Sequence, residues 1–423
     1  MNSSSFVLFA LQIAAMLACA MLCGQIARRL GQPAVLGEMV GGIILGPTVF
    51  GALAPTLFNG LFHASAEVTA ARDAVIKLGM LFFLFIAGLE VNLSNLKRLG
   101  KRAILIGSVG TVLPLAAGVV LAYALPRAFW GPQVDSHFFA FALFLGLNLA
   151  NSANPVIARI LMDLGLLKHD IGTVIMTATV IDDLINWTLF AIILSHVIPP
   201  GSGNANMATG IGLLVLFFVV VLGVGGWLGP KALHWARQRL QWPTAFIALS
   251  ALVILLAAAA AEALGVHAFL GAFLIGAALG GSGEERNEAY EVISVFALSF
   301  FAPIYFVSMG LNANFIADFD FAMVAVVVTV ACVSKIGGVL LGSRLAGMPL
   351  SRESWAIGFG LNARGATGIV LAGVGLEYGL IDERIFVTMV VMALVTSLLS
   401  APAISRLMGK SRANNLTPGE PSS

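Results

Sequence analysis

The sequence predicts an all-α membrane protein that crosses the bilayer about thirteen times and is built from two inverted repeats. Three observations lead to this prediction: the composition, the distribution of cationic residues between the loops, and matching motifs in the two halves of the chain. Of the 423 residues, 59% are hydrophobic and only 10% are charged, and the mean hydropathy is +0.97. A soluble fold does not need so much apolar surface, so we expect a polytopic membrane protein.

The composition also narrows the function classes. The formal net charge is +2 and the basic residues form no cluster, so nucleic acid is not an expected partner. The three cysteines, Cys19, Cys23 and Cys332, lie in apolar runs. They indicate neither a disulfide framework nor a metal site, and we expect no cofactor. The first residues lack the positive charges of a signal peptide, so we expect the first apolar run to be a retained membrane helix.

Apolar runs that end at charged or Gly/Pro-rich breaks define the predicted spans. They are residues 6–27, 34–53, 74–91, 102–126, 137–161, 170–197, 208–229, 242–263, 266–283, 288–309, 321–345, 354–378 and 383–408. We expect residues 1–410 to form the transmembrane domain. Residues 411–423 are polar, and we expect them to form a short disordered cytoplasmic tail.

Cationic residues test this count of spans. One set of loops contains Arg28, Arg29, Lys97, Arg98, Lys101, Arg102, Lys168, Lys231, Arg237, Arg239, Arg286, Arg344, Arg352, Arg406, Lys410 and Arg412, whereas the opposite loops contain Arg72, Arg127 and Arg384. Because cationic loops stay on the cytoplasmic side, the N-terminus is expected outside and the C-terminus in the cytoplasm. Opposite termini require an odd number of spans, and thirteen agrees.

Motifs recur in the same order in the two halves. Residues 31–37 match 265–271, residues 83–89 match 305–311, and 146–148 match 360–362. The shared order favours duplication over chance recurrence among the 46 glycines. We expect repeat 1 at about 6–197, a linker helix at about 208–229 and repeat 2 at about 242–408. The matches are seven spans apart, and an odd shift inverts the second copy, an arrangement typical of secondary transporters with a site near mid-membrane.

Two adjacent carboxylates, Asp182 and Asp183, lie in the middle of an apolar run from about 171 to 198. An acidic residue at the centre of a membrane helix costs about 3 kcal/mol on the mildest scale. Such carboxylates should face a water-filled cavity or a buried partner, and binding protons or cations is the function that best accounts for them. The alternative is a polar seam that only holds helices together.

Two paired spans contain segments that are poor continuous helix, residues 148–155 and 360–368. The candidate site residues within them are Asn151, Ser152, Asn154, Pro155, Asn362, Arg364 and Thr367. Interrupted helices at corresponding positions of two repeats indicate a transport site, because unwound backbone offers carbonyls to cations. A plain proline kink is the alternative for Pro155, and packing between helices is equally compatible with Asn151, Ser152 and Thr367.

Basic residues also lie near the middle of two predicted spans, 321–345 and 354–378. Lys335 lies near the middle of span 321–345 and needs a counter-ion, for which Asp182 and Asp183 are the candidates; the alternative is snorkelling to the interface. Arg364 either bonds carbonyls freed by the broken helices or reaches the lipid headgroups from near a helix end.

Several motifs together resemble the monovalent cation:proton antiporters. They are residues 31–38 with Gly46-Pro47, residues 85–90, 155–161, 304–310 and 362–365. The resemblance covers nearly the whole chain and is nearest the branch with bacterial sodium/proton antiporters, potassium efflux systems and plant cation/proton exchangers. It implies a homodimer in a bacterial cytoplasmic membrane, each subunit having a dimerisation domain and a core domain with two crossed, broken helices.

The resemblance also implies roles for residues. The ion-binding aspartate of the family falls on Asp183, the site of the transported cation, and the acid partner of the core lysine falls on Asp182, with Lys335 as that lysine. Adjacent aspartates resemble the electrogenic members, which exchange two protons for one cation. The chain departs from the family at Ser152, where threonine is frequent, and at Asn154, where an apolar residue is usual.

We therefore expect a secondary antiporter, not an enzyme, in which Na⁺ or K⁺ and protons compete for Asp183. An electroneutral K⁺/H⁺ exchanger is the alternative within transport. A cation channel and an intramembrane aspartyl protease are more distant alternatives. The protease is disfavoured because adjacent residues on a helix project about 100° apart.

Overall fold

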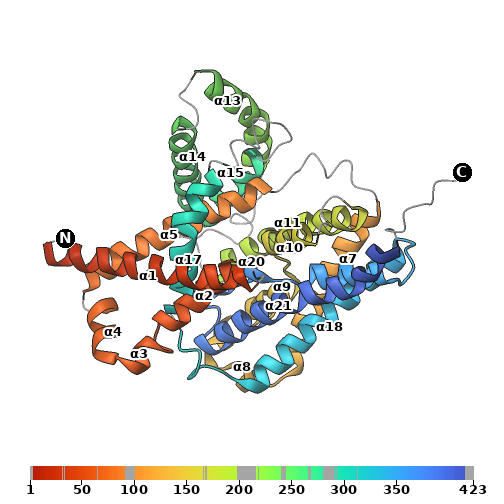
Figure 1. The fold of residues 1–423 in the computed structure, drawn as a ribbon, viewed down its shortest axis with the longest axis horizontal. Helices are drawn as coiled ribbons and strands as arrows, with labels where there is room; N and C mark the ends of the chain where they lie inside the picture. The colour runs from red at the N-terminus through yellow and green to blue at the C-terminus, as the bar shows by residue number, and fades with distance from the viewer. Residues whose placement is uncertain are drawn as a thin grey trace, which may run out of the picture. The chain divides into compact units, whose positions relative to one another are not determined.

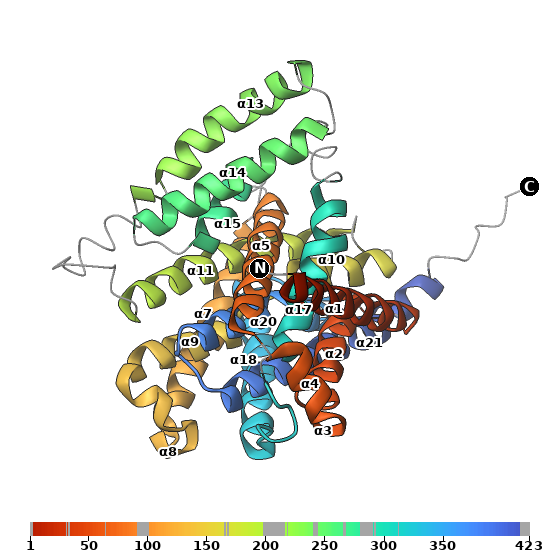
Figure 2. The same cartoon turned by 90° about the vertical axis from the view of Figure 1, so that its left-hand side faces the viewer.

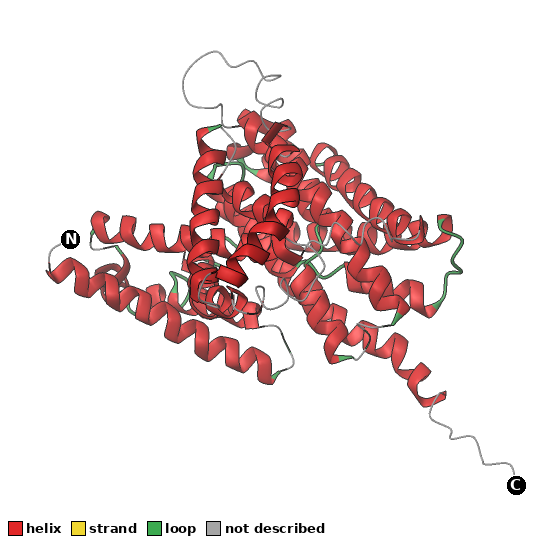
Figure 3. Cartoon of the chain, turned by 90° about the horizontal axis from the view of Figure 1, so that it is seen from above, coloured by secondary structure: helices red, strands yellow, loops and turns green. Residues whose placement is uncertain are grey.

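The computed structural model describes most of the chain. The described residues are 3–30, 32, 34–63, 65–90, 101–164, 166, 169–197, 216–217, 219–239, 244–264, 268–279, 291, 293–311 and 313–414. Within these ranges the secondary structure is helical, and no described residue belongs to a strand (Figure 3). The helices divide into two compact units, Met1–Arg98 with Trp187–Phe319 and Leu99–Asn186 with Asp320–Ser423.

The first unit contains helices from both halves of the chain (Figure 1). They are α1 (Ser3–Arg29), α2 (Ala34–Leu45), α3 (Phe50–Leu53), α4 (Pro55–Phe62), α5 (Ala66–Glu90), the π-helical turn η2 (Val221–Gly225), α13 (Gly226–Arg239), α14 (Thr244–Ala263), α15 (Ala268–Leu279), the π-helical turn η3 (Ala297–Phe301) and α17 (Ala302–Leu311). Figures 1 and 2 show α13 and α14, in green, as neighbouring helices.

The second unit contains the other helices. They are α7 (Lys101–Ala124), α8 (Arg127–Trp130), the 3₁₀ helix η1 (Pro132–His137), α9 (Phe138–Ala150), α10 (Asn154–Asp163), α18 (Phe321–Leu345), α19 (Arg352–Leu361), α20 (Gly365–Glu377) and α21 (Glu383–Asn414). Helix α11 (Asp170–Val197) begins in this unit, and the division between the units falls after Asn186.

Seven helical segments within the described residues are long and apolar enough to cross a membrane. They are Ser3–Arg29, Ala34–Leu53, Arg102–Ala124, Asp170–Phe190, Ile293–Leu311, Phe321–Leu345 and Glu383–Met408. The described residues therefore agree with a helical fold that has several candidate membrane spans, whereas the count of thirteen spans stays a prediction. The bounds predicted for 170–197 and 321–345 are those of α11 and α18.

Other bounds differ from the prediction for identifiable reasons. The span predicted at 34–53 has the bounds of the candidate segment Ala34–Leu53, but its helix is interrupted, because α2 ends at Leu45 before Gly46-Pro47 and α3 begins at Phe50. Proline cannot donate the hydrogen bond that would continue the helix. Part of the predicted linker helix, 208–215, lies outside the described residues, and α13 continues to Arg239. Helix α21 continues to Asn414, so residues 411–414 are helical although they were expected in the tail.

Glycines set the close helix contacts of the first unit. A Cβ on Gly42 of α2 would overlap the backbone of Val307, and one on Gly310 of α17 would overlap the backbone of Gly42. In the same way, a Cβ on Gly88 of α5 would overlap Phe273, and one on Gly276 of α15 would overlap Phe85. The backbones of α2 and α17 are therefore in direct contact, and so are those of α5 and α15. Small residues allow such close packing in membrane helices.

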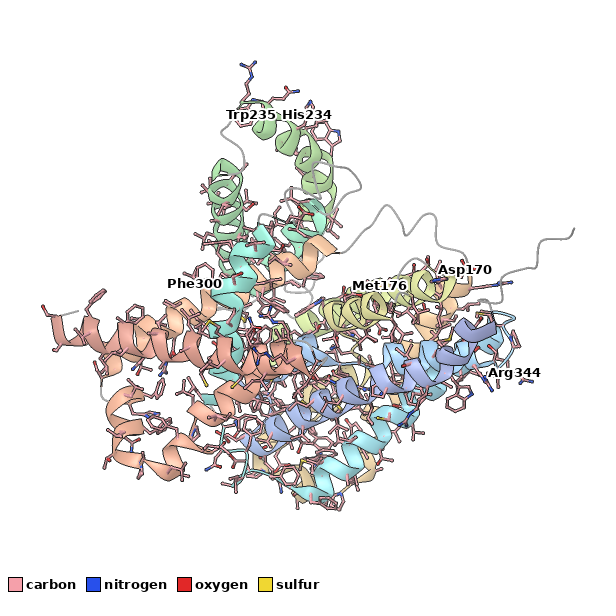
Figure 4. The ribbon with its side chains drawn as sticks, in the orientation of Figure 1. Asp170, Met176, His234, Trp235, Phe300 and Arg344 are labelled. Atoms are coloured by element: carbon pink, nitrogen blue, oxygen red, sulfur yellow. The ribbon has the colours of Figure 1, made fainter. Side chains whose placement is uncertain are left out.

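The second unit has two distinct ends. At one end an apolar cluster joins α7, α10, α11, α18 and α21 through Ile106, Leu161, Ile171, Val339 and Ile404; Asp170 and Arg344 mark this end in Figure 4. At the other end, Arg384 donates to the carbonyl of Phe129 at 2.7 Å and pairs with Asp320 at 3.3 Å. Helices α18 and α21 therefore run in the same direction, opposite to α7 and α11.

Candidate functional site

Two helices of the second unit are broken. Helix α9 ends at Ala150 and α10 begins at Asn154, while α19 ends at Leu361 and α20 begins at Gly365. Both breaks were predicted, but each is shorter than expected because the flanking residues remain helical. Gly365, the first residue of α20, has a φ of +41°, which residues with a side chain rarely adopt. This backbone conformation is not helical, so the chain cannot continue from α19 into α20 as one helix.

The two breaks are in direct contact. The amide N of Ala153 donates to the carbonyl O of Ala363 at 2.7 Å. The hydroxyl of Ser152 donates to the carbonyl O of Leu361 at 2.7 Å. A Cβ on Gly365 would meet the side chains of Ala153 and Val156, so its absence permits this approach. The unwound segments therefore cross at one point inside the unit.

Two basic side chains bind the carbonyls at the C-terminal end of α9. The ammonium of Lys335 donates to the carbonyl of Ala150 at 2.5 Å, and Arg364 donates to that of Leu149 at 2.5 Å. These carbonyls have no partner within α9, and a helix C-terminus carries partial negative charge. The cations therefore stabilise the broken end of α9.

The structure decides between the two roles considered for Arg364. Its side chain is 0% exposed. Besides Leu149, it donates to the carbonyls of Ala331 at 3.0 Å and Asn362 at 3.0 Å. Arg364 thus bonds carbonyls freed at the breaks and does not reach toward headgroups.

Asp182 has a charged partner and two neutral ones. The Nζ atom of Lys335 lies 2.5 Å from Oδ2 of Asp182, and both side chains are buried. The Ser152 hydroxyl also donates to Oδ2, and the hydroxyl of Thr111, from α7, donates to Oδ1. The open choice of counter-ion for Lys335 is therefore resolved in favour of Asp182.

Asp183 lies among different neighbours. The amide Nδ2 of Asn154 donates to Oδ2 of Asp183, and the hydroxyl of Thr179 donates to Oδ1 of Asn154. Thr179 can also donate to the carbonyl of Met176 at 2.8 Å. Asp183 is 5% exposed. Among the described contacts, the ammonium of Lys335 thus pairs with Asp182, and the amide of Asn154 donates to Asp183.

The remaining predicted residues lie around this centre. Asn186 donates to Oδ1 of Asn151 at 3.4 Å, and both side chains are buried. Within the described residues, Nδ2 of Asn151 and Oδ1 of Asn186 have no hydrogen-bond partner. The Oδ1 atom of Asn362 accepts from Arg364 at 2.8 Å. Asn362 therefore supports the arginine, and none of its described hydrogen bonds goes to the aspartates.

Thr367 and Pro155 also have no described contact with the two carboxylates. Thr367 is buried in the first turn of α20, without a described hydrogen bond to Asp182 or Asp183. Pro155 is the second residue of α10, and its side chain lies outside the described side chains.

Sequence reasoning missed Thr111, Thr179 and Asn186. Isolated threonines are common in membrane helices, so residue type alone gave no signal for Thr111. Thr179 precedes Asp183 by four residues, which places both on one helix face, and this spacing could have identified it.

Comparison with known proteins agrees with the expected class. Residues 15–410 match the family described as "Sodium/hydrogen exchanger, transmembrane". The chain is 30% identical over 410 residues to "Na(+)/H(+) antiporter NhaS4" of Synechocystis sp., which covers 96% of this chain and 98% of that protein. It is 32% identical over 407 residues to "Cation/H(+) antiporter 17" of Arabidopsis thaliana, covering 94% of this chain and 48% of that protein. The chain thus spans about half the length of this plant relative.

A solved structure shares the fold. The sodium proton antiporter MjNhaP1 from Methanocaldococcus jannaschii superposes with a TM-score of 0.67 at 15% sequence identity, covering 98% of this chain and 100% of that chain.

Proposed function

We propose, because this chain belongs to the transmembrane sodium/hydrogen exchanger family, that it exchanges Na⁺ or K⁺ for protons by alternating access, with Asp183 as the shared binding group. Membership makes the chain a multi-pass membrane protein of a cation/proton antiporter family and not an enzyme. The cation, the stoichiometry and the site residues belong to the proposal.

The amide that faces Asp183 carries the proposal. Lys335 pairs with Asp182 at 2.5 Å. The amide of Asn154 donates to Oδ2 of Asp183 and also has an oxygen that could face a cation, so Asp183 is the carboxylate that we propose an incoming ion neutralises. A bare carboxylate is costly to move through a low-dielectric region, whereas a protonated or cation-bound one is nearly neutral. Competition for one carboxylate therefore couples the two fluxes.

Oxygen ligands for a cation are available beside Asp183. Asn154 now donates its Nδ2, and a half-turn of the amide would present Oδ1 to a bound cation. The hydroxyl of Thr179 then has the carbonyl of Met176 as an alternative acceptor at 2.8 Å, leaving its oxygen free to accept from the amide. We propose Asp183, Asn154 and Thr179 as the ligand set, with Asn151 and Ser152 contributing from the break.

The contacts of the first unit support inverted repeats. Gly42 and Gly276 occupy matching positions of the two sequence repeats, as do Gly88 and Gly310. Gly42 contacts Gly310, and Gly276 contacts Gly88, so exchanging the repeats reproduces the same pair of contacts. The broken helices fit this arrangement, since α9 and α10 lead toward the apolar cluster while α19 and α20 lead away from it. We propose thirteen spans in this symmetry.

We propose that the two units are the core domain and the dimerisation domain that the resemblance implies. The second unit contains both broken helices and the charged residues, and we propose it as the mobile core. We propose the first unit as the dimerisation domain of a homodimer. The ends of α18 and α21 with Arg344 and Arg406 lie at the apolar cluster of the second unit, which supports placing that end and the C-terminus in the cytoplasm.

Reconstituted transport tests the proposal. The purified protein is placed in proteoliposomes, and proton movement is followed while Na⁺, K⁺ and Li⁺ are supplied in turn at clamped voltage. Wild type should exchange at least one of these cations, and Asp183→Asn should abolish exchange. Asp170→Asn, an exposed acid at the start of the same helix, is the matched control and should exchange normally. Full exchange by Asp183→Asn would overturn the site assignment.

Voltage dependence separates the two stoichiometries. Acids at both 182 and 183 support two protons per cation, so an imposed voltage should change the initial rate. A rate independent of voltage would favour electroneutral K⁺/H⁺ exchange, and a rate that does not saturate with ion concentration would favour a channel.

A further inference from the structure

We propose that Thr111 is a further positioning residue of the antiport site, and that its hydroxyl selects Oδ1 of Asp182 as the proton-accepting oxygen. This inference rests on the proposed function and extends it to a residue in α7.

A glycine brings Thr111 to Asp182. A Cβ on Gly107 would lie 3.2 Å from the backbone of Ala178, so α7 and α11 approach closely at this pair. Thr111 and Asp182 each follow that pair by four residues on their own helices, which places them on the same faces one turn further along. Thr111 is 0% exposed and donates to Oδ1 of Asp182.

The two oxygens of Asp182 are bonded unequally. Oδ2 accepts from the ammonium of Lys335 at 2.5 Å and from the hydroxyl of Ser152. Oδ1 accepts from the neutral hydroxyl of Thr111. A cation beside Oδ2 disfavours a proton there. An arriving proton therefore binds Oδ1, the oxygen that faces Thr111.

The Thr111 hydroxyl serves both protonation states. It has one hydrogen and two acceptors in reach, Oδ1 of Asp182 and the carbonyl of Gly107 at 2.8 Å. When Asp182 is ionised, the hydroxyl donates to the carboxylate. When Oδ1 carries a proton, it donates to Thr111 Oγ1, whose hydrogen turns to Gly107. Neither state leaves a buried polar atom unsatisfied at this position, which would cost free energy.

Ser152 has an equivalent choice on the other oxygen. Its hydroxyl donates to Oδ2 of Asp182 or to the carbonyl of Leu361 at 2.7 Å. Because Oδ2 remains an acceptor when Oδ1 carries the proton, Ser152 can keep its bond to Oδ2, and only the hydroxyl of Thr111 has to turn.

Charged groups near Asp182 come from three elements. Lys335 belongs to α18, Arg364 precedes α20, and Asp183 is the neighbour on α11. Helix α7 contributes the neutral Thr111, and the first break contributes the neutral Ser152. Removing the Thr111 hydroxyl therefore changes proton binding without changing the charge of the site.

Infrared difference spectroscopy on reconstituted protein tests the inference. The carboxylic C=O band of Asp182 is identified by its loss in Asp182→Asn and is then titrated with pH. Thr111→Val keeps the shape and removes the hydroxyl. A hydrogen bond to a charged group is stronger than one to a neutral group, so the ionised state loses more. The band should shift in frequency, and its midpoint should move up by about one pH unit, a tenfold change in proton affinity.

Further variants distinguish the loss of the hydroxyl group from a merely structural effect. Thr111→Ser restores the hydroxyl and should restore the midpoint, and Thr111→Ala replaces Thr111→Val if that variant does not fold. Thr388→Val is the matched control, because Thr388 is equally buried and donates to the carbonyl of Arg384 on its own helix at 3.0 Å. It should leave the band unchanged.

The outcomes separate the two proposals. A wild-type band and midpoint in Thr111→Val, or the absence of an Asp182 band throughout the titration, would overturn the inference. In either case the loss of exchange in Asp183→Asn would still support the proposed function. Full exchange by Asp183→Asn would instead overturn the proposed function itself.

Discussion

The ammonium of Lys335 lies 2.5 Å from Oδ2 of Asp182, and both side chains are withdrawn from solvent in the interior of one unit. The same ammonium bonds the carbonyl of Ala150 at the end of α9. A single side chain thus connects the acid of α11 to the first helix break. Protonation of Asp182 would weaken one of these bonds and leave the other in place.

Breaking this pair should destabilise the protein in a way that a second substitution repairs. Lys335→Ala leaves a buried carboxylate without its cation, which costs about 3–5 kcal/mol. We expect a lower Tm for Lys335→Ala than for wild type, and recovery in Lys335→Ala with Asp182→Asn. Thermal unfolding in detergent measures both.

The functional result of the same variants should differ from the stability result. The double variant lacks one titrating pair, so its exchange should lose voltage dependence although its Tm recovers. A double variant that is stable and keeps the voltage dependence of wild type would contradict the role given to the pair.

Asn154 should control cation affinity. Asn154→Ala removes the amide oxygen that we propose as a ligand of the cation bound beside Asp183. An interaction of this kind with a charged group contributes about 1.5–3 kcal/mol. We expect the KM for the transported cation to rise about tenfold or more, with a smaller rise in Thr179→Val. Thr173→Val, at an exposed position that bonds the carbonyl of His169 at 3.2 Å, is the control. An unchanged KM in Asn154→Ala would remove Asn154 from the ligand set.

Arg364 should not be replaceable by lysine. Its planar group bonds carbonyls of three segments, those of Leu149, Ala331 and Asn362. An ammonium presents its donors in another geometry, and each buried carbonyl left unbonded costs about 1–3 kcal/mol. Arg364→Lys should therefore lower Tm and speed amide hydrogen exchange around the first break. Amide hydrogen-exchange rates equal to those of wild type would show that the planar guanidinium group is not needed at this position.

Glycine contacts should determine the stability of the first unit. Gly310→Ala places a methyl group against the backbone of Gly42, and such overpacking costs about 1–3 kcal/mol. A lower Tm is the expected result. Gly226→Ala in α13 meets nothing within 4 Å and should be neutral or stabilising. Equal Tm values for the two variants would contradict the close packing of α2 and α17.

Much of the fold was predictable because apolar runs and charges are local signals. The bounds of α11 and α18 agree with the predicted spans, since an aspartate lies at the start of each run and prolines follow its end. The stop at Gly46-Pro47 was missed because a span was defined by hydropathy rather than by backbone donors. The π-helical turn Ala297–Phe301 precedes Pro303, and hydropathy does not register such a change in helical pitch either.

The site was predictable in its charged members and not in its neutral ones. Buried charges are costly, so Asp182, Asp183 and Lys335 were conspicuous in an apolar sequence. The choice of Asp182 as the partner of Lys335 required coordinates or a family resemblance, because adjacent residues are equivalent by hydropathy. Thr111 lies in another helix, and only the approach at Gly107 brings it to Asp182.

Competition between a cation and a proton for Asp183 is tested most directly by cation-induced proton release from the purified protein in weakly buffered solution. Adding Na⁺ or K⁺ to wild type should release protons in a saturable manner, and choline should release none. Asp183→Asn should release no protons on addition of either cation, while Asp170→Asn should match wild type. Undiminished proton release from Asp183→Asn would contradict the proposal that ion and proton share this carboxylate.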